Sequence, residues 1–232
     1  MKKKKKISRK QLLKEPDEFL ALSTRLFNYT MENINYVLIS IGSLLALTLF
    51  VVLINYFFAS SERKASFAFQ QALAKYVKFQ NEDSSIKMED ILKDLDKIKN
   101  KHSGASSGKI ALLLYANACY DAGRFDKAIE LYKKAAKKID KNSSLYPFTQ
   151  QGLAYSFAEI EDYETSISYF EKVISSSTPM LKESALFQLG IFYDKIGNTQ
   201  KSKENFEKLS LEFKDTKYSK IALDQISQLD NS

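Results

Sequence analysis

The sequence predicts an all-α protein in which one N-terminal transmembrane helix precedes an α-solenoid of stacked helix pairs. Three observations support this fold class. The run from Tyr36 to Phe58 contains no charged residue, as a membrane-spanning helix requires. The chain after residue 108 repeats an apolar pattern at intervals of about 38 and about 36 residues. The 232 residues include only seven Gly, three Pro and no Trp, which disfavours a turn-rich β-sandwich or barrel.

Residues 1–33 are predicted to form a basic tail. They contain nine Lys or Arg and four Asp or Glu, which leaves 26 Lys or Arg and 24 Asp or Glu for the rest of the chain. The positive charge is therefore concentrated in the tail, which includes the run Lys2–Lys6. Binding to nucleic acid requires a basic face on the folded domain. Because the folded part is nearly neutral, we expect no nucleic-acid partner.

A helix is expected near the end of this tail. Pro16, Asp17 and Glu18 favour a helix start, since proline fits the first turn and acids complement the positive end of the helix dipole. Apolar residues then recur at steps of three and four: Phe19, Leu22, Leu26 and Tyr29. This helix either lies on the cytoplasmic leaflet or is the polar entry to the membrane helix. The sequence leaves both interpretations open.

Residues 34–59 are predicted to be the transmembrane helix. As a helix, the uncharged run Tyr36–Phe58 would extend about 34 Å, enough to cross the hydrocarbon core. A cleaved signal peptide ending near Ala59-Ser60-Ser61 is the main alternative, but the run is too long and starts too deep in the chain. A buried core helix is disfavoured, because so long a run would need cover on every side.

The basic tail predicts the orientation of this helix. Positive charge is retained in the cytoplasm and is attracted to anionic lipid there, which places the following domain on the opposite side of the membrane. Arg63 and Lys64 flank the far end of the helix and weigh against this orientation. They belong to a long domain, and charges in a long domain have less effect on the orientation of a membrane helix than charges in a short tail.

Residues 60–108 are predicted to be a degenerate first repeat, because residues 62–80 and 88–99 each show a helical apolar stripe. Residues 109–215 contain three clearer helix pairs, in which the segments 124–132, 162–170 and 198–206 align. Residues 216–232 are predicted to form a capping helix that covers the last apolar face.

Small residues recur at two positions of the three clear copies. They are Ala116, Ala154 and Gly190 in the first helices and Ala128, Ser166 and Ser202 in the second helices. They let paired helices approach closely, and aromatic residues such as Tyr132, Phe170 and Phe206 fill the next layer. Glu161 stands where the other copies have Gly123 and Gly197.

This pattern resembles the tetratricopeptide repeat. In that fold the first helix of each pair lines a concave face that binds polypeptides. The resemblance assigns nine residues to this peptide-binding face: Leu113, Asn117, Tyr120, Phe148, Gln151, Tyr155, Phe187, Ile191 and Asp194. Several are apolar or aromatic, which suits an extended or helical peptide. The alternative is that Phe148, Phe187 and Ile191 only pack against neighbouring repeats.

The whole layout is similar to the bacterial inner-membrane tetratricopeptide family that includes the ancillary subunit of the Sec translocon. The resemblance implies a single-pass protein of the inner membrane, with a cytoplasmic N-terminus and a periplasmic repeat domain. Its implied role is a protein-binding adaptor that assists the translocon and periplasmic chaperones with exported polypeptides. The alternatives are a scaffold for envelope or cell-division complexes, or an organelle import receptor with cytosolic repeats.

We expect no enzymatic activity, cofactor, metal site or small-molecule substrate. Cys119 is the only cysteine, and the only histidine, His102, lies in a Ser/Gly stretch. Carboxylates such as Glu159 and Glu161 lie at a predicted helix end and turn, where solvated charge is the usual explanation. The sequence contains no Gly-rich phosphate loop and no nucleophile paired with a base.

Overall fold

The computed structural model describes residues 18–81, 85–175 and 178–230. Every regular element in these ranges is an α-helix, so the all-α prediction is confirmed. The chain divides into two units, residues 1–57 and 58–232.

The first unit contains α2 (Glu18–Glu32) and the first half of α3 (Ile34–Gln80). Pro16 and Asp17, which the sequence places at the start of this region, lie outside the described residues. Within α3 the hydroxyls of Ser40, Ser43 and Thr48 donate to backbone carbonyls three or four residues earlier, at 2.8 Å in each case. The polar side chains of this apolar stretch are therefore satisfied by their own helix.

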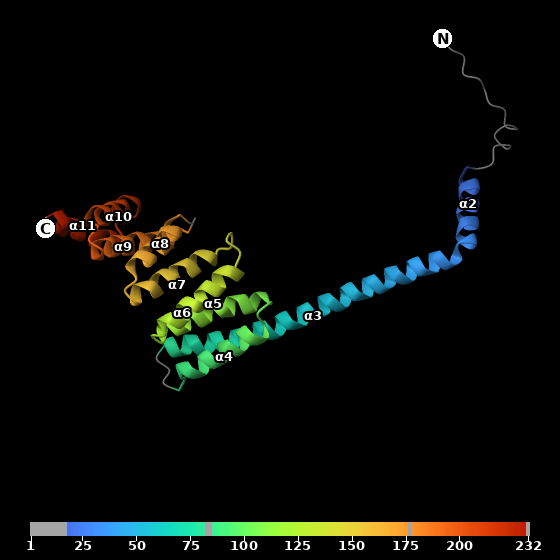
Figure 1. Ribbon diagram of the computed structural model, residues 1–232, viewed down its shortest axis with the longest axis horizontal. Helices are drawn as coiled ribbons and strands as arrows, with labels where there is room; N and C mark the ends of the chain where they lie inside the picture. The colour runs from blue at the N-terminus through green and yellow to red at the C-terminus, as the bar shows by residue number, and fades with distance from the viewer. Residues whose placement is uncertain (1–17, 82–84, 176–177, 231–232) are drawn as a thin grey trace, which may run out of the picture. The chain divides into compact units, whose positions relative to one another are not determined.

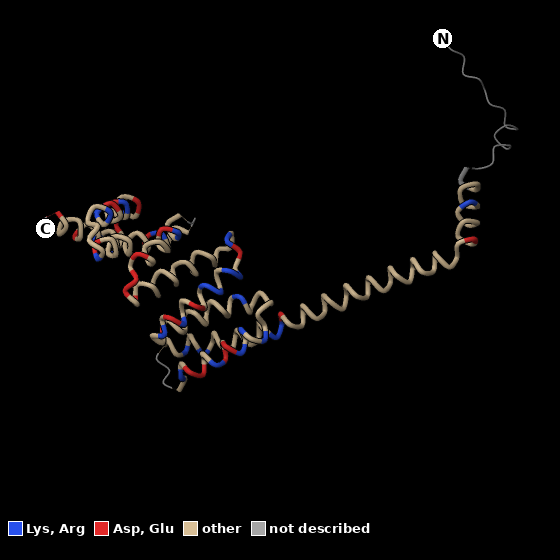
Figure 2. The backbone as a smooth tube through the Cα atoms, in the orientation of Figure 1, with Lys and Arg blue, Asp and Glu red and all other residues tan. Residues whose placement is uncertain are grey.

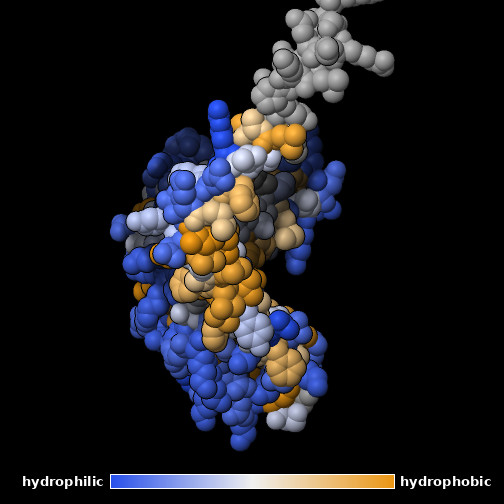
Figure 3. Space-filling view, turned by 90° about the vertical axis from the view of Figure 1, so that its right-hand side faces the viewer, coloured by the Kyte–Doolittle hydropathy of each residue, from blue (hydrophilic) through white to orange (hydrophobic). Residues whose placement is uncertain are grey.

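The first half of α3 exposes its apolar side chains. Leu38, Phe50 and Phe58 are 59, 61 and 72% exposed, and Figure 2 shows this stretch free of charged residues. In Figure 3 hydrophobic colours gather in one region, while most of the visible surface is hydrophilic. Among the described residues, α3 is the one helix long and apolar enough to cross a membrane.

The second unit is a series of helices that pack in chain order (Figure 1). The second half of α3 is followed by α4 (Met88–Lys101), α5 (Ser106–Asp121), α6 (Phe125–Lys138), α7 (Tyr146–Glu159), α8 (Tyr163–Ile174), α9 (Pro179–Lys195), α10 (Thr199–Glu212) and α11 (Lys217–Asp230). The predicted helix pairs correspond to α5–α6, α7–α8 and α9–α10, and the predicted capping helix corresponds to α11.

The range predicted to be a degenerate repeat, residues 60–108, contains the second half of α3 and α4. The predicted transmembrane helix 34–59 and the apolar stripe 62–80 both lie within α3. Ala72 and Tyr76 of α3 belong to the same buried cluster as Ile91 of α4. The Tyr76 hydroxyl also donates to the carboxylate of Asp121 at the end of α5. This half of α3 is therefore part of the repeat core.

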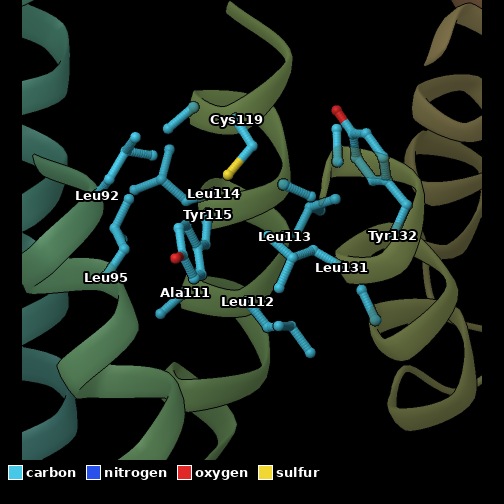
Figure 4. Close-up of a cluster of buried hydrophobic side chains, with 14 of the residues drawn as sticks. Leu92, Leu95, Ala111, Leu112, Leu113, Leu114, Tyr115, Cys119, Leu131 and Tyr132 are labelled. Carbon is cyan, nitrogen blue, oxygen red and sulfur yellow. The ribbon is translucent and has the colours of Figure 1, made fainter. Parts of the chain in front are cut away.

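The largest buried cluster spans α3 to α7. Figure 4 shows its centre, where Leu92 and Leu95 of α4 face Leu114 and Tyr115 of α5. Cys119 lies in the same cluster and is 1% exposed. Smaller clusters follow around α8–α9 and around α10–α11. Such serial clusters are expected when each helix pair buries its apolar face only against its neighbours.

The small residues predicted at helix contacts are all buried. At Gly190, a Cβ atom would lie 2.5 Å from the ring of Phe206, so only glycine fits without a shift of that ring. Ser202 of α10 donates to the Gly190 carbonyl of α9 at 2.7 Å. These contacts fix the close approach of α9 and α10.

The second helix of each later pair begins with a side-chain cap. Asp162 accepts from the Thr165 amide and Asn198 accepts from the Lys201 amide, both at 3.1 Å. Such caps satisfy an amide that has no partner within its own helix. The preceding turns use left-handed backbone, with φ of 62° at Glu161 and 75° at Gly197.

Candidate functional site

A pocket lies at the carboxyl ends of the first helices of the three repeats. We call it the tyrosine pocket. Its volume is about 410 Å³. It is lined by Tyr120 of α5, by Tyr155, Ala158 and Glu159 of α7, by Glu161 and Tyr163, and by Gln188, Phe192 and Lys195 of α9. Two of the nine predicted peptide-binding residues, Tyr120 and Tyr155, meet there.

Tyr120 connects the first repeat to the second. Its hydroxyl donates to the Glu159 carboxylate at 2.9 Å, and its ring packs edge-on against Phe125 at 5.5 Å between centroids. Burial, and next the hydrogen bond to Glu159, raise the pKa of Tyr120 well above its usual value. The phenol therefore remains protonated and acts as a fixed donor on one wall of the pocket.

Tyr163 and Lys195 form another part of the pocket. Tyr163 stacks on Phe192 with 5.5 Å between ring centroids. The Lys195 ammonium lies 4.8 Å from the Tyr163 ring centroid and donates to its hydroxyl at 3.1 Å. An ammonium over an aromatic face is attracted by the ring quadrupole. The pocket therefore combines aromatic surface with two carboxylates, those of Glu159 and Glu161, and the ammonium of Lys195.

Tyr155 also lines the pocket. Its ring contacts Phe170 edge-on at 5.1 Å between centroids, and burial raises its pKa. It remains partly exposed. A rigid, partly exposed aromatic ring provides contact area to a ligand at little cost in side-chain entropy.

Three other predicted residues have partners within the repeats. Leu113 is 8% exposed and belongs to the large core cluster. The side-chain oxygen of Asn117 accepts from the Tyr132 hydroxyl at 2.6 Å. The Gln151 amide donates to Ser184 at 3.0 Å and so links α7 to α9. These side chains are partly or wholly engaged in holding the helices together.

The remaining predicted residues differ in exposure. Phe187 packs against Phe206 and Tyr218, with ring centroids 5.9 and 4.9 Å away. Ile191 packs against the last two buried clusters. Phe148 is 38% exposed, and Asp194 is exposed at the end of α9. Of these four, Phe148 offers the largest aromatic surface to a ligand.

Sequence reasoning did not assign the pocket residues Glu159, Tyr163, Phe192 and Lys195 to the site. Glu159 is exposed, as expected for a charged residue at a helix end, but it accepts a hydrogen bond from another repeat. A signal for two of them was present. Glu159 and Lys195 lie four residues after the predicted Tyr155 and Ile191, and residues four apart share one helix face.

No metal-binding group is found in the part of the chain that the structure describes. There, no three or more His, Cys, Asp or Glu side chains lie close enough to hold an ion. Burial raises the pKa of the Cys119 thiol to about 11, and only the thiolate is an effective nucleophile or metal ligand.

Two segments of the chain match sequence models described as tetratricopeptide repeat, at residues 111–143 and 184–216. They correspond to α5–α6 with the turn that follows, and to α9–α10 with the turn that follows. The chain therefore contains tetratricopeptide repeats, as the internal pattern predicts. No curated protein matches the whole sequence at a significant level.

Solved structures support the same fold. A tetratricopeptide repeat protein from Parabacteroides merdae has a TM-score of 0.58 at 13% identity, covering 71% of this chain and 60% of that chain. A putative kinesin light chain with TPR-like repeats from Podosopora anserina has a TM-score of 0.58 at 14% identity, covering 71% and 86%. A MamA protein from RS-1 has a TM-score of 0.51 at 15% identity, covering 72% and 95%. At these identities the likeness shows the fold alone.

Proposed function

We propose that this protein is a membrane-anchored adaptor that binds polypeptide segments on the concave face of its tetratricopeptide repeats. The observation that carries the proposal is the tyrosine pocket, to which the first helices of three consecutive repeats contribute. Aromatic surface next to a fixed carboxylate and ammonium suits a peptide, which carries both apolar side chains and backbone polar groups. The repeats themselves are interaction scaffolds, so we expect binding without catalysis.

The apolar half of α3 supports the membrane anchor. Water-soluble proteins rarely expose a continuous apolar surface of this extent, whereas a helix in lipid must expose one. Its hydroxyl groups bond within the helix, as the absence of water in the bilayer core requires. The anchor would hold the repeats close to partners at one membrane.

The finer proposal is that the repeats face the periplasm and assist the Sec translocon and periplasmic chaperones with exported proteins. Its support is the basic tail of the sequence, which favours a cytoplasmic N-terminus, together with the resemblance in layout. Exported chains leave the translocon unfolded, and exposed apolar segments are the ligands that the tyrosine pocket suits best.

Site-specific photo-crosslinking in membranes tests the binding proposal. A photoreactive amino acid at Tyr155 should capture translocon subunits, chaperones or exported polypeptides. The matched control is the same amino acid at Lys208, which is exposed on α10 outside the pocket. Capture of such proteins from Lys208 but not from Tyr155 would contradict the proposed site.

Reporter fusions at the C-terminus test the orientation. A reporter active only in the periplasm should be active, and one active only in the cytoplasm should be silent. Arg63 and Lys64 next to the apolar run favour the opposite result. A cytoplasmic readout would support the second candidate, a scaffold or organelle import receptor with cytosolic repeats.

A further inference from the structure

A second pocket lies in the second unit, separate from the tyrosine pocket. The charged residues that line it are all positive. It has a volume of about 580 Å³ and lies between α6, α7 and α8. We call it the lysine pocket. Four lysines line it, Lys133, Lys137, Lys141 and Lys172, and no Asp or Glu is among the described residues that do so.

These lysines lack carboxylate partners in the described part of the chain, although pairing is common elsewhere in it. Lys127 and Lys134 pair with Glu130, and Lys75 pairs with Asp94. None of the four pocket lysines forms an ion pair among the described residues. Lys137 and Lys172 lie in the last turns of α6 and α8, where the helix dipole favours a cation. That placement accounts for neither Lys133 nor Lys141.

The pocket also has defined walls. The Lys172 ammonium lies 4.2 Å from the ring centroid of Tyr169, and the Lys133 ammonium lies 5.0 Å from that of Phe157. Tyr169 and Tyr146 line the pocket together with Gln150, which is 3% exposed. The rings hold two of the ammonium groups beside the cavity. Part of the entropy cost of ordering these two lysine side chains is therefore incurred on folding, before a ligand binds.

We propose that the lysine pocket binds an acidic polypeptide segment, through two or more Asp or Glu side chains. Carboxylates are the natural partners of unpaired ammonium groups, and tyrosine rings provide surface for the rest of a peptide. A membrane surface or a nucleic acid presents charge over a wide area. This site is instead a single cavity, and the repeat unit that carries it is nearly neutral. The interaction is independent of the tyrosine pocket.

Fluorescence anisotropy with the full chain in uncharged detergent tests this proposal. The probe is a fluorescein-labelled peptide of ten glutamates, and the same peptide with ten glutamines is the uncharged reference. We expect binding of the glutamate peptide only, with an affinity that falls as salt is added. The double variant Lys137→Gln with Lys141→Gln should weaken binding about tenfold.

The matched control is Lys208→Gln with Lys220→Gln, which removes the same charge from exposed positions on α10 and α11. It should bind as tightly as the unaltered chain. All four substitutions are at exposed side chains, and circular dichroism confirms that helix content is unchanged. Equal weakening in both double variants, or no binding of the glutamate peptide, would overturn the proposal.

Two further measurements distinguish this proposal from the tyrosine-pocket proposal and from binding to a lipid headgroup. Tyr155→Ala should leave glutamate-peptide binding unchanged, so failure of the tyrosine-pocket proposal would not affect this result. Vesicles that contain phosphatidylglycerol are the competing ligand. Vesicle binding that depends on Lys137 and Lys141, without binding of the glutamate peptide, would replace the acidic segment with a lipid headgroup.

Discussion

At the scale of single residues, Glu161 stands at a turn that requires left-handed backbone. Its φ is 62°, and the matching turns have Gly123 at 70° and Gly197 at 75°. A residue with a Cβ atom pays about 1–2 kcal/mol for this conformation, whereas glycine costs about 0.5–1 kcal/mol of extra chain entropy. The repeats therefore keep a strained residue at one of three equivalent positions.

We predict that Glu161→Gly stabilises the repeats by about 0.5–1 kcal/mol, because relief of strain exceeds the added entropy of the unfolded chain. Urea unfolding followed by circular dichroism measures the change. Gly123→Ala is the converse control and should cost about 1 kcal/mol, since it creates the same strain. A lower midpoint for Glu161→Gly would show that the Glu161 side chain makes a compensating contact.

Ser166 and Ser202 occupy the same position in successive repeats but differ in hydrogen bonding. Ser202 donates to Gly190. Ser166 is fully buried, and its hydroxyl has no hydrogen-bond partner among the described residues. A buried polar group without a partner loses its hydration uncompensated. The first repeat has Ala128 at this position.

We predict that Ser166→Ala is neutral or stabilises the fold by up to about 1 kcal/mol, because it removes a buried group that lacks a partner. Ser202→Ala should instead cost about 1 kcal/mol, since it breaks a formed hydrogen bond. Thermal unfolding of the two variants in parallel measures the difference. Equal destabilisation by both would mean that an ordered water satisfies Ser166.

The sequence predicts the structural roles of some of these residues but not of others. The burial of Ala116, Ala128 and Gly190 is predicted, because small residues at a fixed repeat offset mark close helix contacts. The left-handed turn at Glu161 is recognised only as a departure from glycine. The Tyr120–Glu159 contact is not predicted, since it joins two repeats through side chains 39 residues apart. The periodicity of apolar residues indicates which face of a helix is buried, but it does not indicate which two side chains meet.

At the scale of helices, the N-terminus of α5 is capped from a distance. The Glu62 carboxylate of α3 accepts from the amides of Ser106 and Ser107 at 2.7 and 2.9 Å, and from the Ser107 hydroxyl at 2.6 Å. These hydrogen bonds, those to Ser107 first, lower the pKa of Glu62. The contact fastens the start of α5 to the second half of α3.

We predict that Glu62→Gln loosens the N-terminus of α5 by about 1 kcal/mol at neutral pH, the typical effect of losing a capping carboxylate. Because the folded pKa is lowered, the stabilising contribution is present above the unfolded pKa of 4.5. It is lost as pH falls through the lower folded pKa. Hydrogen exchange of the peptide that spans Ser106 and Ser107 measures it. Equal protection in both proteins at neutral pH would contradict the capping role.

The helix pattern is well predicted from the sequence, including the helical stretches that form α3. Apolar stripes locate α4 to α11 because each helix buries one face against the next. Helical stripes are predicted on both sides of residues 59–61, and α3 runs through them without a break. Ala59, Ser60 and Ser61 are compatible with an uninterrupted helix.

At the scale of the whole molecule, the exposed apolar half of α3 carries the proposed membrane anchor. We predict that the full chain remains with membranes after alkaline carbonate extraction. Leu45→Arg with Leu49→Arg should shift most of it to the soluble fraction, because each central Arg costs about 2.5–3.5 kcal/mol on insertion. Leu45→Ala with Leu49→Ala is the matched control and should stay in the pellet. Extraction of the unaltered chain by carbonate would contradict the anchor.

The fold class follows from the sequence because each repeat contacts only its neighbours, so local pattern and global architecture agree. The peptide-binding face is less predictable. A resemblance transfers helix positions, but whether Phe187 is open or packed against Tyr218 depends on the side chains of the next helix. Which proteins bind also depends on the surfaces of those proteins, which the sequence of this chain does not describe.

The hydrogen bond from Tyr76 to Asp121 has a consequence for protein synthesis. Its two residues are 45 positions apart, and ribosomes add about 5–20 residues per second. The apolar face of α3 at Ala72 and Tyr76 therefore waits about 2–9 s for α5 to be made. During that interval α4 is already available to pack against α3, but the contacts of α3 with α5 cannot yet form.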